Sequence, residues 1–102
     1  MYRPAGSLLG LMTVLDHAVV DGALAGSAWK RDGDHLVKVT KHGTFVPALA
    51  YVNAVGAVAE SFDHHPDIDI RWDTVTLRLT NHSAGGLTQK DLDVAAAIDE
   101  IP

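Results

Sequence analysis

The chain has no cysteine among its 102 residues. This absence excludes disulfide scaffolds, thiolate nucleophiles and cysteine-ligated zinc sites. Basic residues are also few, because eight lysines and arginines stand against thirteen aspartates and glutamates, which gives a formal net charge of −5. Nucleic-acid binding draws most of its affinity from cationic side chains on phosphates. We therefore expect no direct binding of DNA or RNA.

Long hydrophobic runs are absent too. No uninterrupted apolar run approaches the roughly 20 residues of a membrane-spanning helix, so we expect no membrane partner. Arg3, the apolar run 7–15 and the small-residue tripeptide 23–25 loosely resemble a signal peptide. Three polar residues interrupt this pattern before the supposed cleavage site: Asp16, His17 and Asp21. The sequence therefore favours a cytoplasmic protein.

The rest of the composition is that of one folded domain. Hydrophobic residues make up 47% of the chain and charged residues 21%, a balance typical of globular proteins. A chain of this length has room for a single domain and buries only roughly 60–65% of its unfolded surface. Because such a core is small, a homodimer or homotetramer would add stability.

The first 40 residues predict a helix followed by a β-hairpin. Apolar residues recur at helical spacing over residues 7–25. In the segment Trp29–Val39, strand-forming residues flank Asp32-Gly33, which is a strong two-residue turn signal.

A second predicted helix is the clearest element of the pattern. Thr44 is a suitable N-cap, and Pro47 falls in the first turn, where its missing N–H has no helical partner in any case. The helix must end near His64, because Pro66 pushes the preceding residue out of the helical region. Its predicted apolar stripe consists of Phe45, Leu49, Val52, Val55 and Ala59.

Two further strands and a last helix complete the pattern. Apolar residues alternate over 68–72 and 75–79, with a bend predicted at Asp73-Thr74. After the loop Gly85-Gly86, a capping box of Thr88 and Asp91 begins the helix. The order helix, two strands, helix, two strands, helix predicts an α+β fold: a four-stranded antiparallel sheet with helices packed on one face.

Three of the six histidines stand at predicted element ends. Glu60 and His64 are four residues apart, so we expect both to project from one face at the end of the second helix. His65 follows where the chain becomes extended, and His82 ends the fourth strand. Imidazole both gives and accepts protons near neutral pH. These residues therefore indicate a proton-transfer site for a small molecule.

Other interpretations compete with this site. An adjacent histidine pair at a helix end is also typical of a surface cap that interacts with the helix dipole. Three histidines could ligate zinc, but the usual ligand spacings are absent, so we expect no metal. Asp91 fits a cap better than a catalyst. Strand alternation places His82 with the polar residues Thr76 and Arg78, so the three histidines meet only if the pocket opens at the strand end or on that polar face.

The other histidines and the tryptophans have simpler structural interpretations. Trp29 and Trp72 fit core or interface anchors better than ligand-stacking residues. The remaining histidines lie in polar stretches and are predicted at the surface: His17, His35 and His42.

Several motifs occur together in a specific combination. They are Glu60-Ser-Phe-Asp-His64-His65-Pro66, an aromatic residue at Trp72, His82, and Gly85-Gly-Leu-Thr-Gln-Lys-Asp91. This combination resembles the pterin-4a-carbinolamine dehydratases, also called 4a-hydroxytetrahydrobiopterin dehydratases. The resemblance extends over roughly residues 14–100.

The sequence departs from the family pattern in two places. Asn81-His82-Ser83 stands where the family usually has Thr-His-Asp, and Leu92 stands where a tryptophan often follows the aspartate. The first departure argues against a role for a carboxylate beside the third histidine.

The resemblance implies an activity and a set of site residues. The substrate would be a tetrahydropterin with a hydroxyl on carbon 4a, and loss of water would give quinonoid dihydropterin. His64 and His82 would be the acid/base pair, with His65 as the third catalytic histidine, binding and orienting the pterin. Glu60 would hold a histidine or a ring nitrogen. The remaining substrate-binding residues would be Asp63, Pro66 and Asp91. No metal or organic cofactor is needed.

The resemblance also implies partners and an alternative. Family members form homodimers and homotetramers, one animal member is a dimerisation cofactor for a homeodomain transcription factor, and some bacterial relatives look like Rubisco assembly factors. A non-catalytic interaction or assembly module is therefore the alternative, and the presence of Glu60 with all three histidines favours the enzyme. Met12-Thr-Val-Leu15 resembles the usual start of family members, so residues 1–11 are predicted to be an N-terminal extension before a single domain, 12–102.

Overall fold

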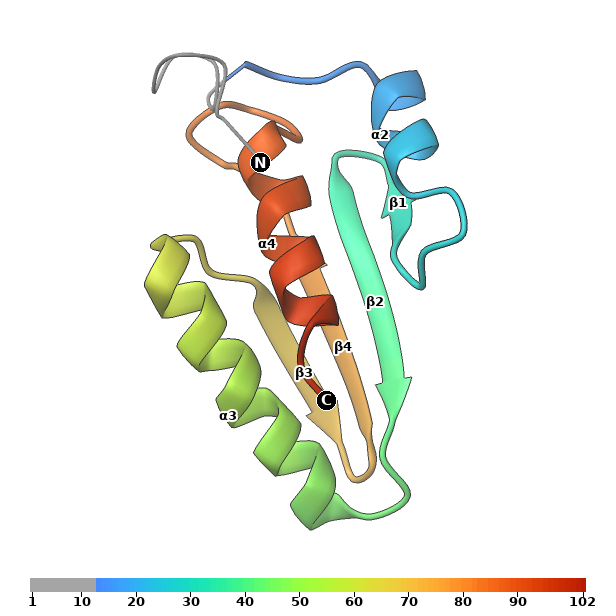
Figure 1. Cartoon of the computed structure of the whole chain (residues 1–102), viewed down its shortest axis with the longest axis vertical. Helices are drawn as coiled ribbons and strands as arrows, with labels where there is room; N and C mark the ends of the chain where they lie inside the picture. The colour runs from blue at the N-terminus through green and yellow to red at the C-terminus, as the bar shows by residue number, and fades with distance from the viewer. Residues whose placement is uncertain (1–12) are drawn as a thin grey trace.

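A four-stranded antiparallel sheet and three helices form the part of the chain that the computed structural model describes, residues 13–102. In chain order the elements are α2 (His17–Ala23), β1 (Lys30–Asp32), β2 (His35–Lys41), α3 (Phe45–Phe62), β3 (Asp67–Arg71), β4 (Thr74–Leu79) and α4 (Gln89–Asp99) (Figure 1). The strands lie in the order β1-β2-β4-β3, and all neighbours are antiparallel. The predicted element order and α+β class are confirmed.

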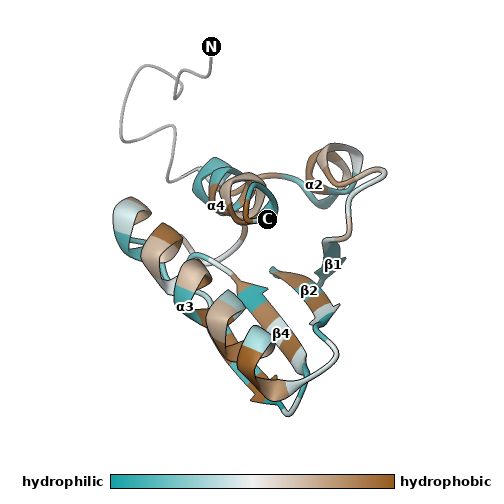
Figure 2. Cartoon of the chain, turned by 60° about the horizontal axis from the view of Figure 1, so that its bottom comes forward, coloured by the Kyte–Doolittle hydropathy of each residue, from teal (hydrophilic) through white to brown (hydrophobic). Residues whose placement is uncertain are grey.

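The core lies between one face of the sheet and the helices. Val75, Leu77 and Leu79 alternate along β4 and are buried, whereas the residues between them are only half-buried. Helix α4 contributes Val94 and Ile98 to the same cluster. In Figure 2 the apolar stretches of β2 and β4 lie beside the helices, as expected for a sheet with one covered face. Trp29 is 1% exposed, which confirms it as a core residue.

Helix α3 begins where the sequence predicts and presents a different face to the core. Thr44 is its N-cap, and Asp63 ends it in the left-handed region with φ 49°. Its buried residues are Ala48, Val55 and Ala59. Phe45 and Leu49 of the predicted stripe are 45% and 41% exposed, so that part of the stripe is wrong.

Both predicted hairpin turns lie one residue from their expected place. Asp32 pairs with His35, so the first loop is Gly33-Asp34, and Gly33 takes a left-handed φ of 58° that glycine adopts without a steric penalty. Arg71 pairs with Thr74, so the second loop is residues 72–73. Trp72 lies in this turn and is 64% exposed, so it is not a core anchor.

The first predicted helix is shorter than its apolar spacing suggests. Within the described chain it begins at His17, with Asp16 as N-cap. Residues 13–16 are not helical, and the N–H of Leu15 donates to the carbonyl oxygen of Leu87 at 2.8 Å. The rest of the predicted helix, 7–12, and the predicted extension 1–11 lie outside the described residues.

Helix α3 is also apolar for a helix of its length. Its 18 residues have a mean hydropathy of 1.3, which by length and composition alone would allow it to cross a membrane. Helices of globular domains meet the same criterion, and α3, which is 17% buried, packs along one side against β3, β4 and α4. Its uncovered side includes Val46, which is 73% exposed.

Candidate functional site

The pairing of β3 with β4 brings the histidine-bearing segments to one end of the sheet. Asp67, the first residue of β3, pairs with Arg78 near the end of β4. His64 and His65 precede β3 at the same end where His82 follows β4. Figure 1 shows the connection from α3 to β3 and the loop from β4 to α4 at this end of the molecule. The topology therefore gathers the three predicted catalytic histidines in one region.

His64 is held by a buried carboxylate. Its Nε2 atom lies 2.6 Å from Oδ1 of Asp91, and the exposed fractions of the two side chains are 12% and 0%. A carboxylate accepts hydrogen bonds, so Nε2 must carry the proton of this contact. The other ring nitrogen, Nδ1, is then the one that can exchange a proton with a bound molecule.

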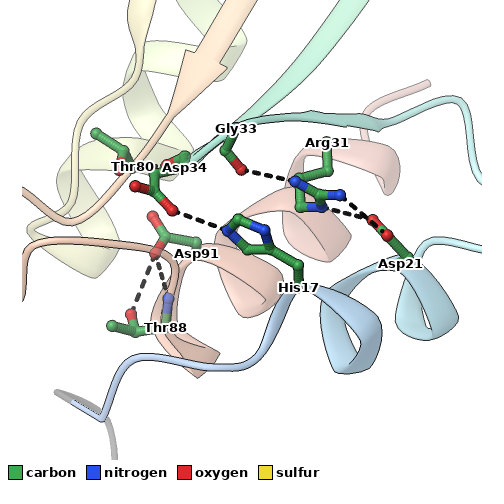
Figure 3. A network of polar contacts seen from close by, with 8 residues as sticks. All are labelled: His17, Asp21, Arg31, Gly33, Asp34, Thr80, Thr88 and Asp91. Atoms are coloured by element: carbon green, nitrogen blue, oxygen red, sulfur yellow. Dashed lines mark hydrogen bonds and ion pairs between the residues drawn. The ribbon is translucent and has the colours of Figure 1, made fainter.

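The same carboxylate caps helix α4. Oδ2 of Asp91 accepts hydrogen bonds from the backbone N–H of Thr88 at 2.8 Å and from its hydroxyl at 3.1 Å (Figure 3). This confirms the predicted capping box. Asp91 therefore fixes the first turn of α4 with one oxygen and His64 with the other.

Glu60 contacts His65 rather than sharing a helical face with His64. Oε2 of Glu60 lies 2.7 Å from Nε2 of His65, and the two side chains are 79% and 54% exposed. The predicted arrangement with His64 is wrong because α3 ends at Phe62 and the left-handed Asp63 turns the following residues off the helical face. An exposed pair of this kind contributes little stability. Because both side chains are exposed, a ligand can reach them.

The two other predicted binding residues of this segment lie in the α3–β3 connection. The carbonyl oxygen of Asp63 accepts a hydrogen bond from Nζ of Lys90 at 3.4 Å, which links the connection to α4. Pro66 is half-buried directly before β3.

His82 stands in an exposed turn between β4 and α4. No hydrogen bond or ion pair of residues 13–102 joins it to His64 or His65. The preceding Asn81 is only 6% exposed and forms an isolated β-bridge with Gly86. The alternation of buried and exposed residues therefore continues past β4, as the sequence indicates. His82 is exposed, and its position depends on the backbone of the loop.

Two polar residues of this region were not predicted as site residues. Within the described chain the buried polar residues are Asn81, Thr88 and Asp91. Thr88 could be recognised from sequence as a cap, and Asn81 only as a departure from the family pattern. Their burial around the first turn of α4 is a tertiary effect, which local sequence patterns do not report.

The remaining histidines lie elsewhere. His17 is exposed, as predicted, with Nε2 3.0 Å from Oδ1 of Asp34 (Figure 3). His42 is half-buried, with Nε2 2.8 Å from Oγ1 of Thr40 and its ring 4.7 Å from that of Tyr51, so the surface prediction is wrong for it. His35 is half-buried in β2, so the surface prediction is wrong for it as well.

Two of the cavities lined by residues 13–102 lie away from this site. One, of about 340 Å³, is lined mainly by α3 and the C-terminus, including His42 and Tyr51. The other, of about 310 Å³, lies between the α2–β1 region and α4, beside Trp29. In residues 13–102 no three histidine, aspartate or glutamate side chains form a group that could hold a metal ion.

Comparisons with known proteins point to one family. The family model described as pterin 4 alpha carbinolamine dehydratase matches residues 13–101. A relative from Roseiflexus sp. (strain RS-1) is 48% identical over 92 residues, which cover 89% of this chain and 99% of the relative. A relative from Nocardia farcinica is 51% identical over 73 residues, which cover 72% of this chain and 77% of the relative. Both are provisionally named pterin-4-alpha-carbinolamine dehydratase.

Two solved structures share the fold at lower sequence identity. A transcriptional coactivator/pterin dehydratase from Brucella melitensis superposes with a TM-score of 0.79, at 23% identity, over 85% of this chain and 96% of that one. A pterin dehydratase-like protein identified as a RuBisCO assembly factor in the alpha-carboxysome gives a TM-score of 0.56, at 22% identity, over 70% of this chain and 82% of that one.

Proposed function

The chain belongs to the pterin-4-alpha-carbinolamine dehydratase family, and on this basis we propose that it dehydrates 4a-hydroxytetrahydropterin. The products are quinonoid dihydropterin and water, so the enzyme is a hydro-lyase of tetrahydropterin regeneration. The observation that carries the proposal is the 2.6 Å contact between Nε2 of His64 and the buried carboxylate of Asp91.

The reaction needs two proton transfers. The bond between carbon 4a and its hydroxyl oxygen breaks, and a general acid gives that oxygen the proton that completes water. The N5–H bond also breaks, a base takes its proton, and the electron pair forms the new double bond between N5 and carbon 4a. General acid–base catalysis of this kind contributes about 10²–10⁴-fold to rates. In the proposal His64 and His82 are this pair.

In the proposal, Asp91 makes His64 suitable as one of the two acid/base residues. The carboxylate fixes the ring orientation and stabilises the imidazolium that forms when Nδ1 accepts a proton. Because both side chains are largely removed from solvent, this electrostatic interaction is stronger than it would be at the surface.

The exposed side chains of the same region would bind the pterin. His65, which follows His64 directly, forms a solvent-accessible pair with Glu60. In the proposal this pair binds the polar edge of the pterin ring. Asp63 and Pro66 lie in the connection that carries both histidines. No metal or organic cofactor takes part in this scheme.

The proposal includes a cytoplasmic homodimer or homotetramer. Its support is the uncovered side of α3, where Phe45, Val46 and Leu49 are exposed, since apolar patches of this kind mark interaction surfaces. Light scattering after size-exclusion chromatography tests this part. A monomer at micromolar concentration would contradict it.

An interaction or assembly module is the second candidate. The same exposed apolar side of α3 favours it, and the structural neighbour described as a RuBisCO assembly factor shares the fold. Stopped-flow dehydration of synthetic 4a-hydroxytetrahydropterin separates the two candidates. The proposed enzyme accelerates the reaction above its spontaneous rate, whereas folded protein that leaves the rate unchanged would support the module.

A further inference from the structure

The buried polar residues of the described chain form one connected chain of hydrogen bonds. His64 contacts Asp91, and Asp91 accepts from the hydroxyl of Thr88. Nδ2 of Asn81 donates to Oγ1 of Thr88 at 3.5 Å. The roles are consistent, because a hydroxyl can donate to the carboxylate and accept from the amide at the same time.

Asn81 also controls the loop that carries His82. Its Oδ1 accepts the backbone N–H of Ala84 at 3.0 Å. Its carbonyl oxygen accepts the N–H groups of Gly85 at 2.9 Å and Gly86 at 3.3 Å, and its own N–H donates to Gly86. The side-chain oxygen of Asn81 therefore holds the turn. Its side-chain nitrogen donates to the Thr88 hydroxyl, which in turn donates to Asp91, the partner of His64.

From this arrangement we propose that Asn81 is a positioning residue that sets His82 relative to the His64–Asp91 pair. The inference rests on the proposed function. Burying amide, hydroxyl and carboxylate groups costs free energy unless they are hydrogen-bonded. These three groups hydrogen-bond in sequence, and they connect the two segments that bear the acid/base pair. Ser83, which stands where the family usually has an aspartate, is exposed and makes no hydrogen bond in residues 13–102.

Two variants at one position separate the two parts of this role. Asn81→Asp keeps the oxygen that caps the turn but replaces the amide donor facing Thr88 with an acceptor. Asn81→Ala removes both contacts. Ser83→Ala, on the same loop, is the matched control. Each variant is compared with wild type in stopped-flow dehydration at pH 8, with circular dichroism and thermal melting to establish that it folds.

We expect kcat to fall about tenfold or more in both Asn81 variants, since small misplacements of catalytic groups are costly. KM should stay within about threefold of wild type, because Asn81 does not touch substrate. Ser83→Ala should retain wild-type kcat. A folded Asn81→Asp protein with wild-type kcat would overturn the proposal, because the link to Thr88 would then be dispensable.

A second measurement keeps this inference apart from the proposed activity. In ¹⁵N-imidazole NMR, Asn81→Asp should move the ring-nitrogen signals of His64, and Ser83→Ala should leave them in place. Unchanged His64 signals in Asn81→Asp would overturn the inference whether or not the wild type is active. If the wild type accelerates nothing, the activity proposal fails, and shifted His64 signals would still support the positioning link.

Discussion

Nε2 of His64 lies 2.6 Å from Oδ1 of Asp91, across a separation of 27 residues in the sequence. The contact joins the segment after α3 to the first turn of α4. Because the other oxygen of Asp91 caps that turn, the orientation of a catalytic histidine and the start of a helix depend on one carboxylate. Stability and the proposed activity are therefore coupled at this residue.

The substitution Asp91→Asn tests the contribution of the charge. The amide oxygen can still accept the Thr88 N–H, so the cap is partly kept, but a neutral amide stabilises the imidazolium of His64 poorly. We expect kcat for dehydration to fall about 10- to 100-fold. Asp93→Asn is the matched control, because Asp93 lies on the same helix and bonds the side chain of Gln89. Wild-type kcat in folded Asp91→Asn would contradict the role given to the carboxylate.

The sequence predicts only half of what Asp91 does. The spacing of Thr88 and Asp91 is a local signal, so the capping box could be recognised without a structure. The contact with His64 depends on how α3 ends and how α4 packs, and both are tertiary effects. The same reason explains why Glu60 and His64 do not share a helical face: α3 ends at Phe62, and the left-handed backbone of Asp63 turns the following residues off the helix.

The hydroxyl of Tyr51 is buried near the side chains of Lys38 and Thr40, but neither lies in good hydrogen-bonding geometry, and no other residue of 13–102 does. A desolvated and unsatisfied polar group costs free energy. We expect Tyr51→Phe to raise the free energy of unfolding by about 1 kcal/mol, measured by urea denaturation at pH 7 with an unchanged m-value. A loss of stability would show that the hydroxyl is satisfied in solution.

Burial also raises the pKa of Tyr51, and the nearby charge of Lys38 opposes the shift. The folded chain therefore keeps the phenol proton at a pH where the unfolded chain loses it. This stabilising term is complete below about pH 10, the pKa of an unfolded tyrosine, and is lost as the pH rises toward the folded pKa. Denaturation at pH 8 and pH 10.5 should show a smaller alkaline loss in Tyr51→Phe than in wild type. Equal losses would contradict the raised pKa.

A bidentate ion pair joins α2 to β1. Nε and Nη2 of Arg31 lie 2.7 and 3.1 Å from the two carboxylate oxygens of Asp21 (Figure 3). This hydrogen bonding lowers the pKa of Asp21 below its ordinary value. The pair stabilises the fold above about pH 4, the pKa of an unfolded aspartate, and the effect is lost as the pH falls through the folded pKa. The pair is exposed, so its contribution is small.

Carboxyl ¹³C NMR titration measures this pKa directly. The titration midpoint of Asp21 should be lower in wild type than in Arg31→Gln, where the guanidinium is absent. The same midpoint in both proteins would contradict the assignment.

Sequence patterns locate the strands better than they locate the turns and helix faces. Alternation identifies β3 and β4 because one face of the sheet is buried. Asp32-Gly33 is a sound turn signal, yet cross-strand pairing places Gly33 first in the loop. Phe45 and Leu49 fit an apolar stripe, but the buried side of α3 includes the small Ala48 and Ala59. Side-chain size at a packed interface cannot be read from helical periodicity alone.

The central claim is that His64 and His82 perform the proton transfers, and single-turnover stopped-flow dehydration of 4a-hydroxytetrahydropterin tests it most directly. Wild type, His64→Ala and His82→Ala are compared with His35→Ala, a histidine of β2 outside the site, and with the spontaneous reaction. The account predicts acceleration by wild type and His35→Ala that falls at least about 100-fold in each of the other two variants. Wild-type acceleration in folded His64→Ala or His82→Ala would contradict it.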